Sequence, residues 1–159
     1  MELKKLFLFF LIFSSIIFFD NHRAFSQAAG KAEKGTVFVP AYSSILYGDL
    51  SREFNLAITL SIHNTDLNNS IIINTIDYYN TKGKIIFRYL KNNTIILKPL
   101  ETYNLGIKES DKRGGIGANF IVKWSGDGQV SRPLIETIMI ATRAQQGISF
   151  TSRGETISD

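Results

Sequence analysis

The chain has 159 residues, with 18 Lys and Arg against 14 Asp and Glu and no cysteine. The lack of cysteine excludes a structural disulfide, a thiol nucleophile and a metal bound through cysteine. The net charge of +4 is small and its residues are interspersed, whereas proteins that bind nucleic acid gather basic residues on one face, so we expect no nucleic-acid partner.

The N-terminal residues have the three parts of a secretory signal peptide. Lys4 and Lys5 precede an apolar stretch, Leu6 to Phe19, that is too short to span a bilayer as a permanent helix. Small residues then stand at Ala24 and Ser26, the two positions that signal peptidase reads. We predict that residues 1–26 are cleaved and that a soluble protein without permanent membrane insertion reaches the periplasm or the medium. An uncleaved membrane anchor is the alternative.

The first part of the exported chain predicts strands after a short entry. Residues 27–35 are small, polar and charged, and we expect them to be a flexible entry segment. Residues 36–40 follow as an expected edge strand, because Pro40 has no backbone N–H to donate to a sheet. The clearest signal is Glu53 to Asn64, where apolar residues take every second position. These positions are Phe54, Leu56, Ile58, Leu60 and Ile62.

The middle and end of the chain continue in strands. Residues 71–79 are β-branched and aromatic, and a turn containing glycine leads into residues 84–90, which predicts a hairpin. Trp124 is in phase with Phe120 and Val122, so we place it in the core. Further strands are expected at residues 94–97, 103–109, 118–125, 134–143 and 147–151. Of these, residues 134–143 are apolar on both faces, as is typical of a central strand.

This pattern predicts an all-β fold. Seven or eight short strands follow one another at intervals of roughly 10–15 residues, with turn residues between them and no sustained helical period. We expect an antiparallel, immunoglobulin-like β-sandwich, formed as a single domain by residues 36–157. Since no cysteine pair is present, the core has to rest on aliphatic side chains and Trp124.

Several short segments of the predicted domain carry a resemblance to a known family. They are Tyr42-Ser43-Ser44-Ile45 with Tyr47-Gly48, Ser51-Arg52-Glu53-Phe54-Asn55-Leu56, Leu60-Ser61-Ile62-His63-Asn64-Thr65-Asp66, Ile76-Asp77-Tyr78-Tyr79, Gly117-Ala118-Asn119-Phe120-Ile121-Val122-Lys123-Trp124 and Gln145-Gln146-Gly147-Ile148-Ser149-Phe150-Thr151-Ser152-Arg153-Gly154. Together they resemble a family of exported bacterial proteins known as domain of unknown function 3124. The resemblance implies an exported single domain and no catalytic residue, because the family has no activity to carry over.

Catalytic residues are hard to assemble from this sequence. His63, the histidine that remains after the predicted cleavage, would need Ser43, Ser44 or Ser149 as a nucleophile, and the G-x-S-x-G motif is missing. Because His63 falls on the polar face of a strand, we expect an exposed histidine without a catalytic role. A single histidine without cysteine also argues against a zinc or copper site, and we expect no metal and no cofactor.

Paired carboxylates are the basis of an alternative function. A small hydrolase of envelope components would need two of them beside a cleft, and the closest in sequence are Asp49, Glu53, Asp66 and Asp77. The presence of each of these carboxylates is explained equally well by a place in a turn or on an exposed strand face. The stretch from Asp66 to Asn68 also lacks the glycine and the final Glu of a calcium loop.

Two segments have the composition of a binding surface. Gln145 to Arg153 sets amides, hydroxyls and a basic residue beside two apolar residues, and Arg113 to Asn119 sets a basic residue and an amide beside glycines. The predicted binding residues are Arg113, Asn119, Gln145, Gln146, Ser149, Ser152 and Arg153. The alternatives are a core-closing edge strand for the first segment and a glycine-rich turn for the second.

The poverty of catalytic side chains favours binding over catalysis. We expect a monomeric, non-catalytic binding or accessory module of the bacterial cell envelope that binds an envelope protein or a small ligand. The alternatives are the carboxylate-dependent hydrolase and a purely structural envelope protein.

Overall fold

A computed structural model describes residues 30–158 except residue 51 and residues 144–145, and the predicted signal peptide lies outside this part of the chain. The described residues form twelve strands. They are β1 (Lys31–Pro40), β2 (Ser44–Tyr47), β3 (Arg52–Asn55), β4 (Ala57–His63), β5 (Ile71–Tyr79), β6 (Ile85–Arg88), β7 (Ile95–Leu97), β8 (Thr102–Ile107), β9 (Asn119–Ser131), β10 (Leu134–Arg143), β11 (Gln146–Arg153) and β12 (Glu155–Ser158). Over the same residues, no helix has the length and apolar character needed to cross a membrane.

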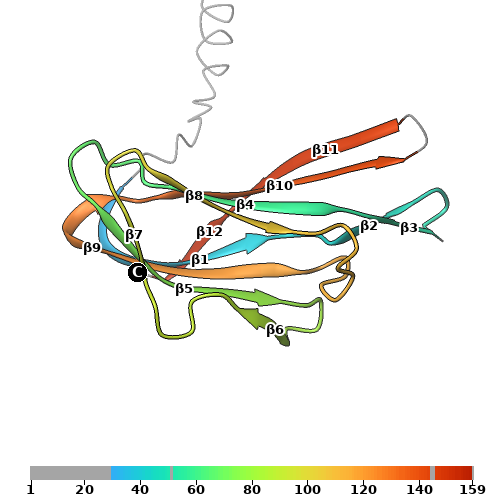
Figure 1. Ribbon diagram of the computed structural model, residues 1–159, viewed down its shortest axis with the longest axis horizontal. Coiled ribbons are helices and arrows are strands. Elements are labelled where there is room, and N and C mark those ends of the chain that lie inside the picture. Colours follow the sequence, from blue (N-terminus) through green and yellow to red (C-terminus); the bar gives the residue numbers. More distant parts are fainter. Residues whose placement is uncertain (1–29, 51, 144–145, 159) are drawn as a thin grey trace, which may run out of the picture.

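Ten of the strands form two facing antiparallel sheets, and β2 and β3 pair as a separate two-stranded sheet (Figure 1). The larger sheet has the order β12-β1-β9-β5-β6, with β7 also paired to β5, and the smaller sheet has the order β11-β10-β4-β8. The predicted all-β, antiparallel sandwich is confirmed. The described residues contain more strands than the seven or eight expected, because β2 and β12 have only four residues each and are too short to show a period of two. In addition, the strand predicted from Glu53 to Asn64 is divided into β3 and β4 at Leu56.

Apolar side chains from both sheets form one core. The alternating pattern of β4 is confirmed, since Ile58, Leu60 and Ile62 are at most 1% exposed. Trp124 on β9 is 2% exposed, as predicted, and lies opposite Gly35 on β1. A side chain at Gly35 would place its Cβ 2.8 Å from Trp124 Nε1, so the indole ring depends on a glycine at this position.

The prediction for the start of the domain is wrong in two respects. Strand β1 begins at Lys31 and already buries Ala32, so residues 31–35 are not a flexible entry. Residues 36–40 are also not at an edge, because β12 pairs with β1 on the side away from β9. Pro40 is tolerated because the register of β12 with β1 ends at Phe38, so no described strand pairs with Pro40 on that side.

Strand β9 was expected to end at residue 125, but it continues through Gly126 and Gly128 to Ser131. Lys34 pairs with Ser125 and Ala32 with Val130, so the residues between Ser125 and Val130 bulge out of the ladder. Gly128 has a φ of 80°, and a Cβ at Gly126 would lie 2.5 Å from Val130 Cγ2. These glycines therefore bend the strand without ending it.

Strand β10 is central in the smaller sheet, as predicted, but only one of its faces is fully buried. Ile135 and Met139 face the core, whereas Ile138 is half-buried and Ile140 is 49% exposed. The apolar residues on the second face therefore meet solvent and not a further layer of protein.

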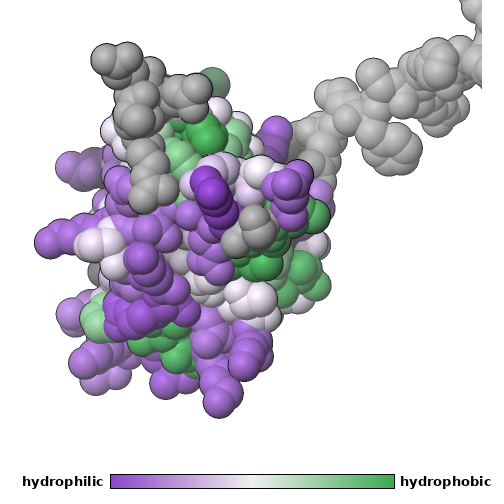
Figure 2. Space-filling view, turned by 90° about the vertical axis from the view of Figure 1, so that its right-hand side faces the viewer, coloured by the Kyte–Doolittle hydropathy of each residue, from purple (hydrophilic) through white to green (hydrophobic). Residues whose placement is uncertain are grey.

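Two hairpins, β10–β11 and β2–β3, extend beyond the body of the sandwich on the same side, to the right in Figure 1. Leu46 and Leu50 of the second hairpin are 40% and 70% exposed. Figure 2 shows this end of the molecule, where hydrophobic areas lie among hydrophilic side chains.

Candidate binding sites

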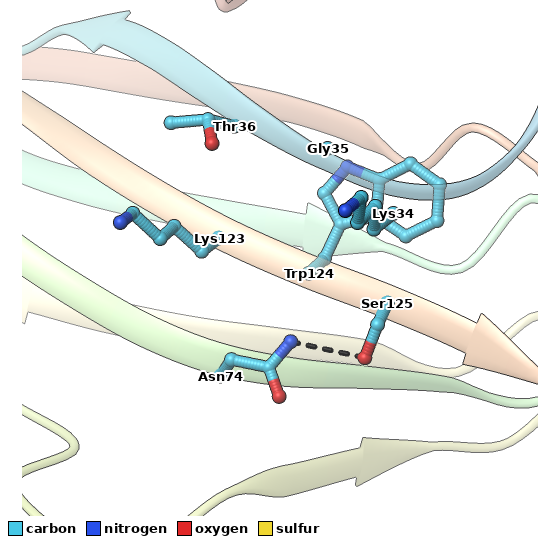
Figure 3. Close-up of a pocket in the computed structure, with 7 residues that line it drawn as sticks. All are labelled: Lys34, Gly35, Thr36, Asn74, Lys123, Trp124 and Ser125. Atoms are coloured by element: carbon cyan, nitrogen blue, oxygen red, sulfur yellow. Dashed lines mark hydrogen bonds between the residues drawn. The ribbon is translucent and has the colours of Figure 1, made fainter. Parts of the chain in front are cut away.

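A hollow of about 280 Å³ lies on the larger sheet, over β1, β5 and β9 (Figure 3). It is lined by Lys34, Gly35, Thr36, Asn74, Lys123, Trp124 and Ser125. The sheet register forms it, because Lys34 pairs with Ser125 and Thr36 with Lys123. Sequence reasoning missed this two-lysine hollow, since its lysines stand far apart in the chain and only the pairing of β1 with β9 brings them together.

Strand β11 carries most of the predicted binding residues and forms one edge of the smaller sheet. It pairs with β10 along its whole length, from Glu136 opposite Arg153 to Arg143 opposite Gln146. The side of β11 that faces away from β10 pairs with no described strand, and we call this side the open edge.

The predicted residues of β11 divide between its two faces. Ser149 and Arg153 are exposed on the outer face. Ser152 is half-buried on the inner face, and its carbonyl accepts a hydrogen bond from Thr137 Oγ1 at 3.4 Å. Gln145 lies outside the described residues, and so does the side chain of Gln146.

The inner face of β11 closes the core, which was the alternative expected for this segment. Ile148 and Phe150 are half-buried, and the Phe150 ring lies 6.2 Å from that of Tyr42 between ring centroids. The strand therefore has both features, a core-closing inner face and an exposed outer face.

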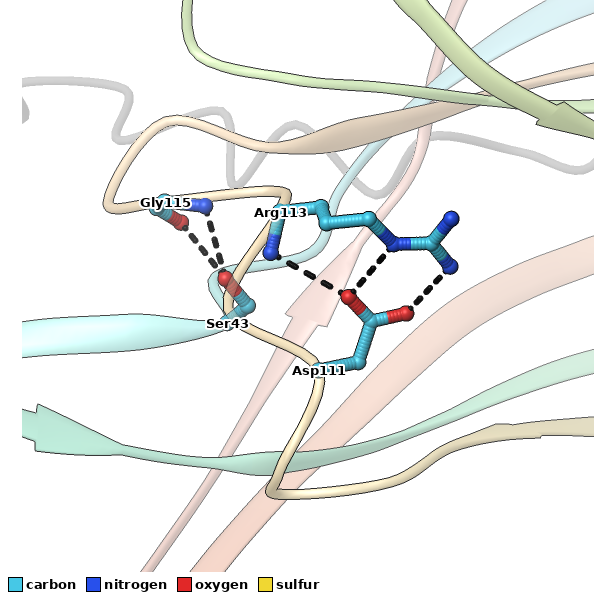
Figure 4. Close-up of polar contacts among 4 residues, drawn as sticks. All are labelled: Ser43, Asp111, Arg113 and Gly115. Carbon is cyan, nitrogen blue, oxygen red and sulfur yellow. Dashed lines mark hydrogen bonds and ion pairs between the residues drawn. The ribbon is translucent and has the colours of Figure 1, made fainter.

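Arg113 lies in the loop between β8 and β9, where it is bound to a neighbour in its own loop (Figure 4). Its Nε donates to Asp111 Oδ1 at 2.9 Å, its Nη2 donates to Oδ2 at 2.6 Å, and its backbone N–H donates to Oδ1 at 3.1 Å. The hydrogen bond from the guanidinium holds the pKa of Asp111 below its usual value and raises the pKa of Arg113. Arg113 is thus an anchor of its own loop, and its role in binding stays a prediction.

The glycines of the same loop are fixed by close contacts. Ser43 Oγ accepts a hydrogen bond from the Gly115 N–H at 2.7 Å and lies 3.2 Å from the Gly115 carbonyl oxygen, to which it donates. A Cβ at Gly114 would overlap the hydroxyl oxygen of Tyr78, a buried residue whose pKa is raised to about 12 by its burial. These contacts agree with the alternative of a glycine-rich turn, and they occupy the hydroxyl group of Ser43.

Residues 42–43 contact both of the segments that were predicted to bind a partner. Tyr42 contacts Phe150 of β11, while the adjacent Ser43 binds Gly115 of the loop. Asn119 belongs to the larger sheet, where it is half-buried between Pro40 and Tyr79. The loop and β11 are therefore held by the same short stretch of chain, but Asn119 does not lie on the outer face of β11.

His63 and the carboxylates have local partners. His63 Nδ1 lies 2.9 Å from Thr102 Oγ1, and its Nε2 lies 3.8 Å from Glu136 Oε1. The buried Asp66 accepts hydrogen bonds from the backbone N–H groups of Asn68, Asn69 and Ser131, and these bonds hold its pKa far below the usual range.

Asp77 pairs with Arg88 at 3.8 Å. Among the described residues, no group of three or more histidine, cysteine or acidic side chains could hold a metal ion. The contacts of Asp66 and Asp77 thus account for two of the four carboxylates from which the hydrolase alternative would take its pair.

The fold defines an antiparallel β-sandwich protein with one long open edge. The chain belongs to the family described as "Protein of unknown function (DUF3124)", which matches residues 34–157 and confirms the resemblance seen in the sequence. No curated protein matches the chain. A solved structure from Thermotoga maritima, "Crystal Structure of Thermotoga maritima 1070", is similar at 11% identity and a TM-score of 0.45, covering 76% of this chain and 92% of that one.

Proposed function

We propose that the protein is an exported, non-catalytic binding module of the bacterial cell envelope, and that an extended segment of a partner protein adds to the open edge of β11. The leader-like residues 1–26 support the export, and the observation that carries the binding mode is the open edge itself. An unpaired row of backbone N–H and C=O groups is a template for another strand, and several binding domains use it in this way.

The open edge differs from the other sheet edges in its length. Strand β11 has eight residues, whereas β8 has six and the edge strands β12 and β6 have four each. Natural proteins protect edge strands by keeping them short or by placing Lys, Pro or a bulge in them. Strand β11 contains no Lys and no Pro, and its register with β10 runs without a bulge.

The surroundings of the open edge suit an extended polypeptide. Ile148 and Phe150 are only half-buried on the inner face, so a partner side chain that extends the sheet would cover apolar surface there. On the outer face, Ser149 and Arg153 offer hydrogen bonds to the alternate side chains of the partner. Backbone pairing supplies affinity in this mode, and the two faces supply specificity.

The test is affinity capture from periplasmic extract with the mature protein and with variants of its edges. The double variant Ser149→Lys/Thr151→Lys puts two positive charges on the outer face of β11, and we expect it to lose the captured partner. Thr156→Lys on β12 is the matched control, since Thr156 is also an exposed edge-strand threonine, and it should capture normally.

Amide hydrogen exchange on the captured complex then locates the contact. Backbone amides of β11 should gain protection when the partner binds, while those of β12 should not change. The proposal is overturned if the double variant has a normal melting temperature and captures the same partner, or if protection appears only outside β11.

A further inference from the structure

The two-lysine hollow gathers positive charge without a compensating carboxylate. Lys34 and Lys123 are both exposed, and no acidic side chain lines the hollow. Among the described residues, neither lysine takes part in an ion pair. Two ammonium groups beside one depression attract an anion that carries more than one negative charge.

The floor of the hollow supplies hydrogen-bond donors in addition to charge. Asn74 Nδ2 donates to Ser125 Oγ at 3.0 Å, as Figure 3 shows, so the hydroxyl hydrogen of Ser125 remains available to a ligand. Thr36 adds a second hydroxyl. Lys34 lies opposite Ser125 and Thr36 lies opposite Lys123, so each lysine has a short hydroxyl side chain across from it.

Two irregularities of the larger sheet border the hollow. The register of β5 against β9 shifts between Ile73 and Thr75, which makes Asn74 the extra residue, and the register of β1 shifts just before Lys34. Such bulges redirect side chains and are common beside binding sites. Next to Asn74, Thr75 Oγ1 is buried without a hydrogen-bond partner among the described residues.

From this arrangement we infer that the two-lysine hollow is a binding site for a phosphate group. A phosphate dianion accepts hydrogen bonds on several oxygens, which matches two ammonium groups and the hydroxyls of Thr36 and Ser125. The site is distinct from the open edge of β11, which belongs to the other sheet.

Titration with inorganic phosphate at constant ionic strength tests the inference. Trp124 is the single tryptophan of the chain and lines the hollow, so its fluorescence reports on binding directly. We expect a saturable change, and Lys34→Gln or Lys123→Gln should each weaken binding by about tenfold, the effect of losing one charge-assisted hydrogen bond. Lys82→Gln, an exposed lysine in the β5–β6 turn, should bind as the wild type does.

A second experiment distinguishes free phosphate from a lipid headgroup. Vesicles of phosphatidylcholine with phosphatidic acid carry phosphomonoesters, and co-sedimentation that Lys123→Gln abolishes would assign the site to lipid phosphate. Saturable binding of inorganic phosphate without co-sedimentation would assign it to a soluble ligand. The inference is overturned if neither probe binds, if chloride gives the same fluorescence change, or if the two Gln variants fold and bind normally.

Discussion

The loop that contains Arg113 and the strand that contains Arg153 have similar compositions but differ in how they contact the rest of the molecule. The loop engages its own polar groups, since Asp111 pairs with the exposed Arg113 and Ser43 holds Gly115. Strand β11 leaves its outer face exposed and its open edge unpaired among the described residues. Composition therefore identifies segments rich in hydrogen-bonding groups, but only the contacts distinguish an anchor from a surface available to a partner.

The largest effect on stability is expected in the core, and the effects in the loop and in β11 can be compared with it. Replacing Trp124 by Ala removes a buried indole that both sheets pack against, and this should cost about 3–5 kcal/mol and lower the melting temperature steeply. His63→Ala, at a partly exposed position, should fold normally. Thermal unfolding followed by circular dichroism checks both, and an unchanged melting temperature for Trp124→Ala would contradict its place in the core.

Two glycines test the loop against the strand directly. Gly114→Ala forces a methyl group into the Tyr78 hydroxyl and should cost about 1–3 kcal/mol, the usual range for overpacking. Gly147→Ala in β11 is the matched variant, because nothing lies within 4 Å of its added Cβ, and it should leave stability nearly unchanged. Equal melting temperatures for the two variants would show that the loop is not tightly packed.

The ion pair of the loop should appear in the pH dependence of stability. The pKa of Asp111 is lowered in the folded protein by Arg113, so the pair stabilises the fold above the unfolded pKa near 3.8 and loses this contribution as the pH falls through the lower, folded pKa. The stability difference between wild type and Arg113→Gln should therefore be present at pH 7 and shrink below about pH 4. Urea unfolding at both pH values measures it, and a difference that grows on acidification would contradict the assignment.

The smallest effect on stability is expected at Arg153. Its exposed side chain lies opposite Glu136, and replacing it by Ala should change stability by no more than about 0.5 kcal/mol. Capture of the partner should nevertheless weaken, because Arg153 belongs to the outer face of β11. If Arg153→Ala unfolds the domain, Arg153 is an anchor like Arg113 and the comparison between the two regions fails.

The sequence was most informative where apolar and polar residues alternate regularly. The period of two in β4 identified Ile58, Leu60 and Ile62 as core, because a half-buried strand requires that pattern. Strand β12 could not be found in this way, since its four residues are all exposed and it exists only because β1 provides a partner. The local pattern thus predicts which residues are buried, but it does not predict which distant segments pair.

The candidate sites show the same limit. The polar character of β11 was readable, but whether Ser152 faces in or out depends on the register with β10. Nothing in the sequence around Lys34 or Lys123 indicated a shared site, because only the pairing of β1 with β9 brings the two residues together. The pairing of Arg113 with Asp111 was not predicted either, because composition alone does not show whether two neighbouring charges bind each other.

The pairing of β1 with β12 also has a kinetic consequence. The first described strand completes its hydrogen bonds only with β9 and with the last described strand, so the larger sheet cannot close before nearly the whole chain is present. Folds dominated by such non-local pairings fold slowly, typically in milliseconds to seconds. For the export proposed above this delay is an advantage, because a chain that is threaded through a membrane has to stay unfolded until it has passed.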